Sequence, residues 1–412
     1  MESRERISMD EKHGKSIRKR VLEDPLFLRT DEYIDEMLEK DTLTELVLQI
    51  GPNCNLECPH CYGAYGPKRK GFPQLKFVRK ALEESVELGI EGITLTDGEP
   101  IRLQTKDVLG LAANFSDRIP LTIMTNAKFA NTVRNTARWI SFLKDEGFEL
   151  NRDGNLIYVS FGEGYKVHWK NYHKLNVALK VIYPDANFGK HLRYSLLYGL
   201  GEDETELADN VASSLANVFG LDGEIEFFPE SNGKVPTYVI PYKKGEYLFI
   251  DCNQCDPQGR ATDLNVFDGV FLFGELSVSK MGFLPREAES LYVAHDGRVS
   301  YGIAGGCVRE ERYAGSLETD SLGEIKRRIQ SDEIYQAKKI GGTRFLYAVA
   351  QDVNPDFRVF GKIGCDVCHS FFSDSDIIEG VRRRLSQDGV AESYKQFIGS
   401  FDLSNKEQCG FV

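Results

Sequence analysis

Six short apolar runs, each followed by a segment of helical spacing, constrain the fold of this chain of 412 residues most strongly. The runs are predicted to be strands because they are short, rich in β-branched or aromatic residues, and bounded by turn residues. Repeated strand–helix units favour a parallel sheet, because each helix carries the chain back to the start of the next strand. The expected strands span residues 43–51, 92–98, 120–126, 155–162, 191–199 and 223–230. Several look apolar on both faces, as in buried parallel sheets. We therefore expect an α/β fold, either an open sheet or a partial barrel of six βα units, which binds ligands at the carboxyl ends of its strands.

The pattern changes on both sides of this region, so we expect three parts. Residues 1–42 carry short amphipathic pieces and are predicted to form an N-terminal helical cap, and residues 43–230 form the partial barrel. Residues 231–412 are predicted to form a small α+β domain. It would contain a hairpin over residues 290–303 with Asp-Gly at its turn, and a helix over residues 321–339.

Composition excludes several classes of function. Lys and Arg total 51 against 63 Asp and Glu, so the net charge of −12 repels phosphate backbones and argues against a nucleic-acid partner. We find no apolar run of the roughly 18 residues that a membrane helix needs, and the first residues are charged rather than signal-like. The expected location is therefore the cytoplasm, without a membrane partner. Nine cysteines in a reducing compartment indicate metal or cluster binding rather than disulfides.

Three of these cysteines stand in one loop, GPNCNLECPHCYGAYG, directly after the first expected strand. Cys54, Cys58 and Cys61 have the spacing CxxxCxxC, which lets one short loop wrap three thiolates around one [4Fe–4S] cube. Since a cube normally takes four thiolates, three leave one iron open to chelate the amino and carboxylate groups of an amino-acid ligand. Two alternatives are a zinc site with His60 as fourth ligand and a structural cluster completed by a distant cysteine.

The segment CNLECPHCY resembles the signature of radical SAM enzymes, whose fold is a partial six-strand (β/α)6 TIM-like barrel. The resemblance covers residues 43–230, and His60 stands where the family usually has an aromatic residue. It implies a [4Fe–4S] cluster on Cys54, Cys58 and Cys61 that takes an electron from flavodoxin or ferredoxin. The family uses this electron to cleave S-adenosylmethionine (SAM) into methionine and a 5′-deoxyadenosyl radical, which abstracts hydrogen from a substrate.

The end of the second strand supports the resemblance. Its sequence TLTDGEP looks like the family's GGEP motif, which holds the amino group of SAM, with Asp97 in place of the first glycine. Gly98 would allow close backbone approach, and Glu99 would pair with the ammonium group. Asn126 matches a TNG-like position at the end of the third strand. The alternative for each is ordinary turn chemistry.

Later strands offer further candidate SAM contacts. Ser160 or Glu163, at the end of the fourth strand, would bond the ribose hydroxyls, with a solvated loop carboxylate as the alternative. Arg193 and Ser195 share one face of the fifth strand by alternation. In the family that face looks toward the SAM carboxylate or ribose, while the alternative for Arg193 is a solvent-facing charge.

The remaining cysteines resemble the SPASM/twitch extension of the family, which binds auxiliary [4Fe–4S] clusters. The segment from Gly302 to Cys307 fits its GxxxxC element. We expect one auxiliary cluster on Cys307, Cys365, Cys368 and one of Cys252 or Cys255. The alternatives are a CxxC…CxxC zinc site and simple buried thiols. Cys409 and the unused member of the Cys252/Cys255 pair are candidate hydrogen-atom donors, and for Cys409 a thiol without a role is the alternative.

The expected function is hydrogen abstraction from a small, polar natural-product or sugar-like substrate. An auxiliary cluster that accepts a second electron would make the reaction an oxidation, and a thiol donor would make it an epimerisation. The first alternative is peptide modification, as in many SPASM enzymes. An alternative of another class is a non-enzymatic iron–sulfur redox sensor or carrier, which would not turn over SAM.

Overall fold

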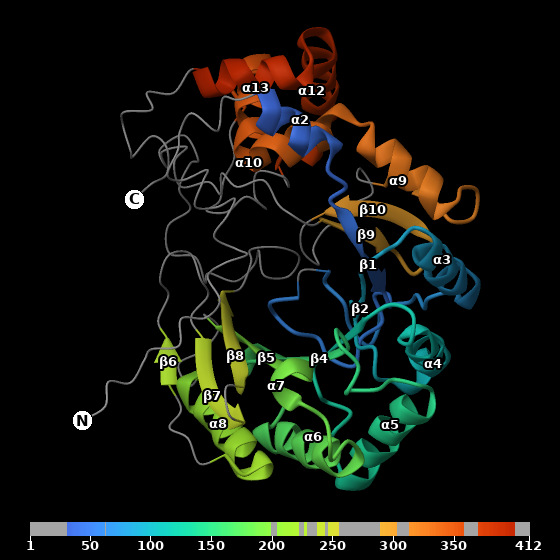
Figure 1. Cartoon of the computed structure of the whole chain (residues 1–412), viewed down its shortest axis with the longest axis vertical. Helices are drawn as coiled ribbons and strands as arrows, with labels where there is room; N and C mark the ends of the chain where they lie inside the picture. The colour runs from blue at the N-terminus through green and yellow to red at the C-terminus, as the bar shows by residue number, and fades with distance from the viewer. Residues whose placement is uncertain are drawn as a thin grey trace. The chain divides into compact units, whose positions relative to one another are not determined.

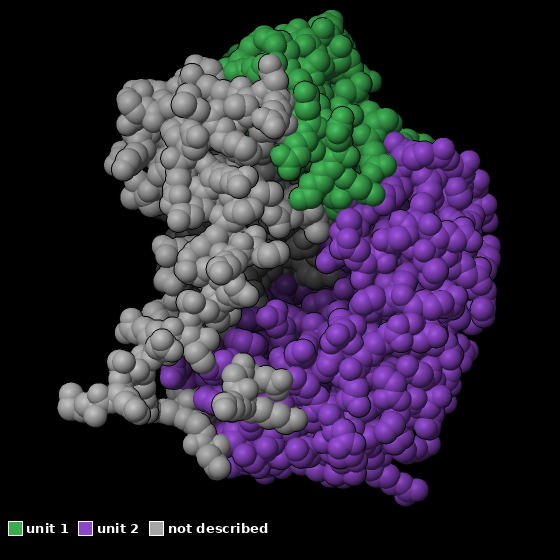
Figure 2. Space-filling model, viewed as in Figure 1, with its two compact units in different colours: residues 1–42, 269–287, 328–412 green, residues 43–268, 288–327 purple. Residues whose placement is uncertain are grey.

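The computed structural model describes residues 31–61, 63–198, 204–221, 226–228, 237–243, 246–254, 289–302, 313–357 and 370–399. The chain divides into two compact units, coloured separately in Figure 2. We call Leu43–Asp268 with Ala288–Arg327 the sheet unit, and Met1–Thr42 with Gly269–Glu287 and Arg328–Val412 the helical unit. The functional division into a barrel and an auxiliary-cluster domain stays a prediction.

A mainly parallel sheet forms the centre of the sheet unit (Figure 1). Its parallel strands, in spatial order, are β9 (Glu289–Val293), β1 (Leu43–Gln49), β2 (Gly92–Thr96), β3 (Leu121–Thr125), β4 (Leu156–Phe161), β5 (Leu192–Tyr198) and β8 (Glu246–Gln254). Antiparallel strands extend both edges: β10 (Arg298–Gly302) and β11 (Gly315–Ser316) beyond β9, and β7 (Thr237–Lys243) and β6 (Glu226–Phe228) beyond β8. The two edge strands, β11 and β6, do not pair with each other in the described residues. The predicted α/β class is therefore confirmed, with a mainly parallel sheet that does not close into a full barrel in the described residues, as expected for a partial barrel.

Helices follow most of the parallel strands and cover the outer side of the curved sheet (Figure 1). They are α3 (Leu75–Glu87), α4 (Lys106–Phe115), α5 (Val133–Asp145), α6 (Trp169–Ile182), the short α7 (Phe188–His191) and α8 (Glu204–Phe219), with 3-10 turns η2 (Leu103–Thr105) and η3 (Glu163–Tyr165). Each longer helix turns an apolar face to the sheet; in α3, for example, Phe77, Val78, Ala81 and Leu82 are buried. The carboxyl ends of the strands are left for the loops that build the site.

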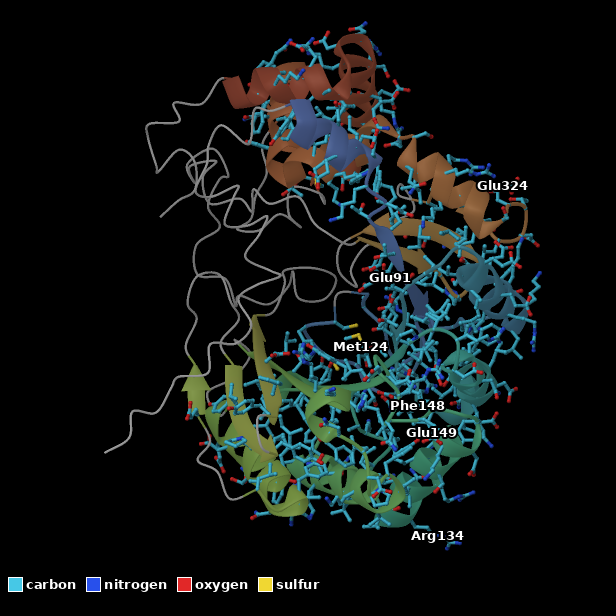
Figure 3. All side chains as sticks on the ribbon, viewed as in Figure 1. Glu91, Met124, Arg134, Phe148, Glu149 and Glu324 are labelled. Atoms are coloured by element: carbon cyan, nitrogen blue, oxygen red, sulfur yellow. The ribbon has the colours of Figure 1, made fainter. Side chains whose placement is uncertain are left out.

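The two faces of the sheet differ in chemistry. On the outer face, under the helices, Ile93, Leu95 and Ile123 are almost fully buried. The alternating inner positions of β2 and β3 are half-buried, and they include three threonines, Thr94, Thr96 and Thr122, beside Met124. Figure 3 shows Met124 inside the curve of the strands. The expectation that strands would be apolar on both faces is therefore wrong for β2 and β3, because in the described part of the chain their inner positions are only half-buried and can keep polar side chains.

The sixth parallel strand is β8, not the expected segment 223–230. Within that segment the structure describes a strand of three residues, β6, which pairs antiparallel with β7 at the sheet edge. The strand β8 has nine residues and runs parallel to β5, and its Leu248 and Ile250 are fully buried. A central position needs a strand with a continuous apolar face, and the sequence of β8 supplies one. The sheet thus continues beyond residue 230.

The predicted hairpin over residues 290–303 is confirmed as β9 and β10. Its Asp-Gly turn places Gly297 at a φ of +87°, a left-handed conformation that suits glycine. The hairpin also continues the main sheet, because β9 pairs in parallel with β1.

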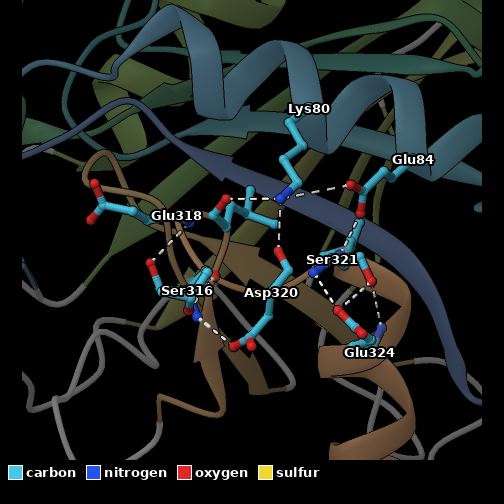
Figure 4. A network of polar contacts seen from close by, with 10 residues as sticks. Lys80, Glu84, Ser316, Glu318, Asp320, Ser321 and Glu324 are labelled. Carbon is cyan, nitrogen blue, oxygen red and sulfur yellow. Dashed lines mark hydrogen bonds and ion pairs between the residues drawn. The ribbon is translucent and has the colours of Figure 1, made fainter.

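The segment after β10 is fixed on helix α3 (Figure 4). Lys80 donates from Nζ to the main-chain oxygens of Leu317 at 2.9 Å and Asp320 at 2.8 Å. Glu84 accepts a hydrogen bond from the amide of Leu322. Ser321 and Glu324 form a reciprocal capping box, in which each backbone amide donates to the other's side chain. These contacts fix the start of helix α9 (Leu322–Gln330).

Helices alone make up the described part of the helical unit: α2 (Asp31–Glu39), α10 (Glu333–Val353), α12 (Ser375–Asp388) and α13 (Val390–Gly399). Their core includes Ile34, Phe345, Val381 and Tyr394. The single helix expected over residues 321–339 is wrong, because Asp332 separates α9 from α10. Its carboxylate accepts hydrogen bonds from the amides of Ile334 and Tyr335 and so caps a new helix. Among the described helices, none has the length and apolar character that crossing a membrane requires.

Candidate metal centre

The three-cysteine loop begins at the carboxyl end of β1 and folds back on itself. The amide of Cys54 donates to the carbonyl of Gly66 at 3.2 Å, and the amide of Gly66 donates to the carbonyl of Pro52 at 3.0 Å. Within the loop, the amide of Cys61 donates to the carbonyl of Cys58 at 3.2 Å. These turns keep three thiols in one compact segment at the edge of the sheet where ligands bind.

All three cysteines are free thiols. Cys54 is 7% exposed and Cys58 8%, while Cys61 is half-buried. The sulfur of Cys61 accepts a hydrogen bond from the amide of Tyr65 at 3.2 Å. The pKa of the Cys54 thiol is raised to about 11, mainly by burial; the hydrogen bond from the Leu56 amide opposes this rise, and the charges of Glu99 and Cys61 add to it.

The loop carries three of the four thiolates that an iron–sulfur cube normally takes. In the described residues, no three side chains of His, Cys, Asp or Glu are arranged to hold one metal ion. The ring of His60 packs edge-on against Tyr165, with ring centres 4.5 Å apart. The thiolates of a cube bind different irons and stand further apart than ligands of one ion. The cluster and the zinc site therefore both stay predictions for this loop.

The end of β2 lies directly against the cysteine loop. Gly98 has a φ of +67°, and a Cβ atom built there would lie 2.6 Å from the main-chain oxygen of Gly51 and 2.8 Å from that of Asn53. Such distances exclude any side chain without a shift of backbone, so only glycine allows this approach. The sequence predicted close approach at Gly98, and the approach is to the loop that carries Cys54.

Glu99 is fully buried and well bonded. Its Oε1 accepts hydrogen bonds from the amide of Ile101 at 2.9 Å and the hydroxyl of Thr125 at 2.7 Å, and its Oε2 accepts one from the amide of Asn126 at 2.9 Å. Burial raises the pKa of Glu99 to about 7, although these hydrogen bonds and the charge of Arg102 lower it in part. A carboxylate has about four acceptor positions, so three donors leave one for an ammonium group.

Asn126 joins β3 to the same loop. Its Nδ2 donates to Oδ1 of Asn55 at 3.0 Å, and its Oδ1 accepts from the amide of Lys128 at 2.9 Å. The structure therefore brings Gly98, Glu99 and Asn126 together with the cysteine loop. In the described residues, the contacts of Asn126 are structural, and a role in binding SAM stays a prediction.

The candidates on β4 and β5 lie on the inner face of the sheet. Ser160 is opposite Ser195, and Tyr158 is opposite Arg193. The hydroxyl of Ser160 lies within hydrogen-bonding reach of the half-buried Tyr165. Ser160 is thus already engaged by a tyrosine that sequence reasoning missed. Glu163 begins η3, and its side chain lies outside the described residues.

Arg193 faces a carboxylate that the sequence did not reveal. Its side chain is 48% exposed, and its Nη1 lies 4.0 Å from Oδ2 of Asp251 on β8. Ser195, two residues on, is opposite Asp251 in the parallel pairing of β5 with β8. The prediction that Arg193 and Ser195 share one face is therefore confirmed. Because β8 was not predicted as a barrel strand, Asp251 was missed.

Asp97, which replaces the first glycine of the GGEP-like motif, adopts a φ of +65° and is buried. Neither of its carboxylate oxygens has a hydrogen bond of ordinary geometry to the described residues. Burial raises the pKa of Asp97 well above its usual range, and the nearby Gln49 side chain lowers it in part. The backbone turn that the motif needs is thus formed with aspartate in place of glycine.

The second cysteine set is largely outside the described residues: Cys255, Cys307, Cys365, Cys368 and Cys409. The backbone of Cys252 lies in β8 opposite Leu196, and its side chain is likewise outside the described residues. The auxiliary cluster and the hydrogen-atom donor stay predictions.

The fold and the loop together define an α/β protein with a free three-cysteine loop at the carboxyl edge of a parallel sheet. No family model matches the sequence, and no curated protein is significantly similar to it. Solved structures similar to the chain include BtrN in complex with AdoMet and 2-DOIA, with 12% identity, coverage of 74% of this chain and 90% of BtrN, and a TM-score of 0.37. Streptococcus suis SuiB bound to the precursor peptide SuiA has 14% identity, coverage of 75% and 70%, and a TM-score of 0.43. Native anSMEcpe with bound AdoMet has 13% identity, coverage of 84% and 99%, and a TM-score of 0.41. The similarity is remote, with all three TM-scores below 0.5.

Proposed function

We propose that the chain is a radical SAM enzyme that abstracts hydrogen from a small polar substrate, giving oxidation or epimerisation. One observation carries the proposal: three free cysteines of a single loop lie at the carboxyl end of β1, and Gly98 at the end of β2 packs against the backbone of that loop. Neither an ordinary structural zinc site nor a simple turn requires both features.

In this proposal Cys54, Cys58 and Cys61 hold a [4Fe–4S] cluster. When bound, the cluster would supply the electron that cleaves SAM into methionine and a 5′-deoxyadenosyl radical. Glu99, whose Oε2 keeps one acceptor position, would orient the ammonium group of SAM. The bonds from Thr125 and Ile101 fix the Glu99 carboxylate before SAM binds.

The inner face of the sheet supports a polar substrate. Along β2 to β5 its positions carry hydroxyl groups and the half-exposed Arg193, with Asp251 beside it. Such side chains bind hydroxyl, amine or carboxylate groups, whereas an apolar substrate would leave them without partners. Oxidation would require the predicted auxiliary cluster, and epimerisation a thiol such as Cys409. Peptide modification is the alternative reaction, and a test with both kinds of substrate distinguishes it from action on a small molecule.

The direct test is anaerobic reconstitution with iron and sulfide, followed by incubation with SAM and dithionite. We expect 5′-deoxyadenosine, and about eight irons per chain if the auxiliary cluster is present or about four if it is not. Cys61→Ser should abolish the product and lower the iron count by about four. Cys61 is the least buried of the three, so the metal-free variant should unfold at nearly the wild-type temperature. Absence of 5′-deoxyadenosine from the reconstituted wild type under every reducing condition would refute the proposal and leave the redox carrier as the alternative.

Two further parts of the proposal need their own tests. Replacing dithionite with flavodoxin or ferredoxin in the same assay examines the electron donor, and cell fractionation examines the cytoplasmic location. Substrate class is narrowed by comparing sugar-like small molecules with peptides for substrate-dependent stimulation of SAM cleavage. Stimulation by peptides alone would replace the small-molecule assignment.

A further inference from the structure

Two positively charged side chains donate hydrogen bonds to the residues on either side of Cys54. Arg102, in the turn after β2, donates from Nη1 to the main-chain oxygen of Asn53 at 2.6 Å and from Nη2 to its side-chain oxygen. Lys128, after β3, donates from Nζ to the main-chain oxygen of Asn55 at 2.9 Å. Two successive strand ends thus each bring one positive charge to the three-residue segment centred on Cys54.

Asn53 and Asn55, the residues on either side of Cys54, are also hydrogen-bonded to other parts of the structure. Asn53 donates from Nδ2 to the main-chain oxygens of Pro67 at 3.3 Å and Arg69 at 2.7 Å, which ties the start of the cysteine loop to its end. Asn55 accepts the hydrogen bond from Asn126. The cations therefore act on a segment whose position is already fixed, so their distance from the Cys54 sulfur cannot relax freely.

Arg102 is hydrogen-bonded to Asn53, the residue before Cys54, so its guanidinium lies beside the cysteine loop. Arg102 is half-buried, whereas Lys128 is exposed, so solvent screens Arg102 less. The chain has a net charge of −12, and these two cations flank a segment that would carry an anionic cluster.

We propose, on the basis of the proposed function, that Arg102 is a positioning residue whose positive charge makes the cluster on Cys54, Cys58 and Cys61 easier to reduce. Lys128 has the same effect on the reduction potential, but a smaller one. Reduction adds one negative charge to the cluster, and a fixed positive charge nearby stabilises the reduced form more than the oxidised form. The two hydrogen bonds to Asn53 fix the guanidinium at one place relative to Cys54.

The test is an anaerobic redox titration of the reconstituted full chain, following the EPR signal that changes on adding SAM. Arg102→Gln should shift the reduction equilibrium about tenfold toward the oxidised form, which for a one-electron couple lowers the midpoint potential by about 59 mV. Arg102→Lys keeps the charge and should recover most of the shift. Lys128→Gln should shift the equilibrium about twofold to threefold because its charge is exposed. Arg134→Gln, which removes an exposed charge on the outer side of α5 (Figure 3), should leave the potential unchanged.

The outcomes separate this inference from the proposed function. A wild type without iron or without 5′-deoxyadenosine refutes the proposed function. A wild type with a normal cluster, whose potential is the same in Arg102→Gln, refutes the charge role of Arg102 alone. If Arg102→Gln does not retain iron, the midpoint potential of Lys128→Gln is the deciding measurement. A potential in Lys128→Gln equal to that in Arg134→Gln overturns the inference. Equal potentials in Arg102→Lys and Arg102→Gln also overturn it, because the charge would then have no effect.

Discussion

The contact between Gly98 and the cysteine loop predicts a specific cost for one added methyl group. In Gly98→Ala the new Cβ would lie 2.6 Å from the Gly51 oxygen and 2.8 Å from the Asn53 oxygen, both of them backbone atoms. Alanine at a φ of +67° also pays backbone strain of about 1–2 kcal/mol. Overpacking adds about 1–3 kcal/mol, because the main chain of the loop must move. The expected loss in the free energy of unfolding is therefore about 2–5 kcal/mol.

Gly89→Ala is the matched control. Gly89 has the same φ of +67°, but a Cβ built there meets nothing within 4 Å. It should lose only the strain of about 1–2 kcal/mol, so the difference between the two variants isolates the contact with the loop.

Urea unfolding followed by tryptophan fluorescence measures this difference. The chain has two tryptophans, Trp139 and Trp169, on α5 and α6 of the sheet unit, so the signal reports that unit. The measurement uses metal-free protein, which removes cluster binding from the comparison. If the two alanine variants lose equal stability, the close approach of β2 to the cysteine loop is wrong, and with it the geometric basis of the site.

Three other predictions follow from described contacts. Leu95→Ala empties a fully buried position under the helices and should cost about 2–5 kcal/mol in the same fluorescence assay; a loss below about 1 kcal/mol would contradict its central packing. The pKa of Glu99 is about 7 in the folded chain and 4.5 in the unfolded chain, so the folded state binds more protons between these values. The free energy of unfolding of the metal-free wild type should therefore fall by about 3 kcal/mol as pH rises from 4.5 to above 7. Metal-free Glu99→Gln should lack this dependence of stability on pH. An unchanged slope would show that Glu99 does not titrate there. Asp332→Ala removes two cap hydrogen bonds of α10 and should cost about 0.5–2 kcal/mol locally, seen as faster hydrogen exchange at Ile334 and Tyr335; unchanged exchange at both amides would exclude the cap.

Features that depend only on local sequence patterns could be predicted. The spacing of Cys54, Cys58 and Cys61 and the Gly98–Glu99 pair are local patterns, and strand alternation placed Arg193 and Ser195 on one face. Five of the expected strands, 43–51 through 191–199, correspond to β1 to β5 with small differences at their ends.

Features that depend on contacts between distant segments were not predictable. The strand beside β5 is β8 and not residues 223–230. Which of two segments pairs there depends on contacts between distant parts of the chain, and a single sequence does not reveal these contacts. Arg102 and Lys128 look like ordinary loop charges until the fold brings them to Asn53 and Asn55. The one available signal was the pair of asparagines that flank Cys54, since asparagine can both donate and accept within a loop.

The pairing of β1 with β9 has a consequence for the order of events during synthesis. About 240 residues separate the end of β1 from the start of β9. At about 5–20 residues per second, the ribosome needs roughly 12–50 s to make them. During that interval β1 and β2 can pair, while the other edge of β1 lacks its neighbour. An open strand edge recruits strands from other chains. We therefore expect nascent chains that end before β9 to need chaperone protection, and truncation before residue 289 to cause aggregation even though the three-cysteine loop is complete.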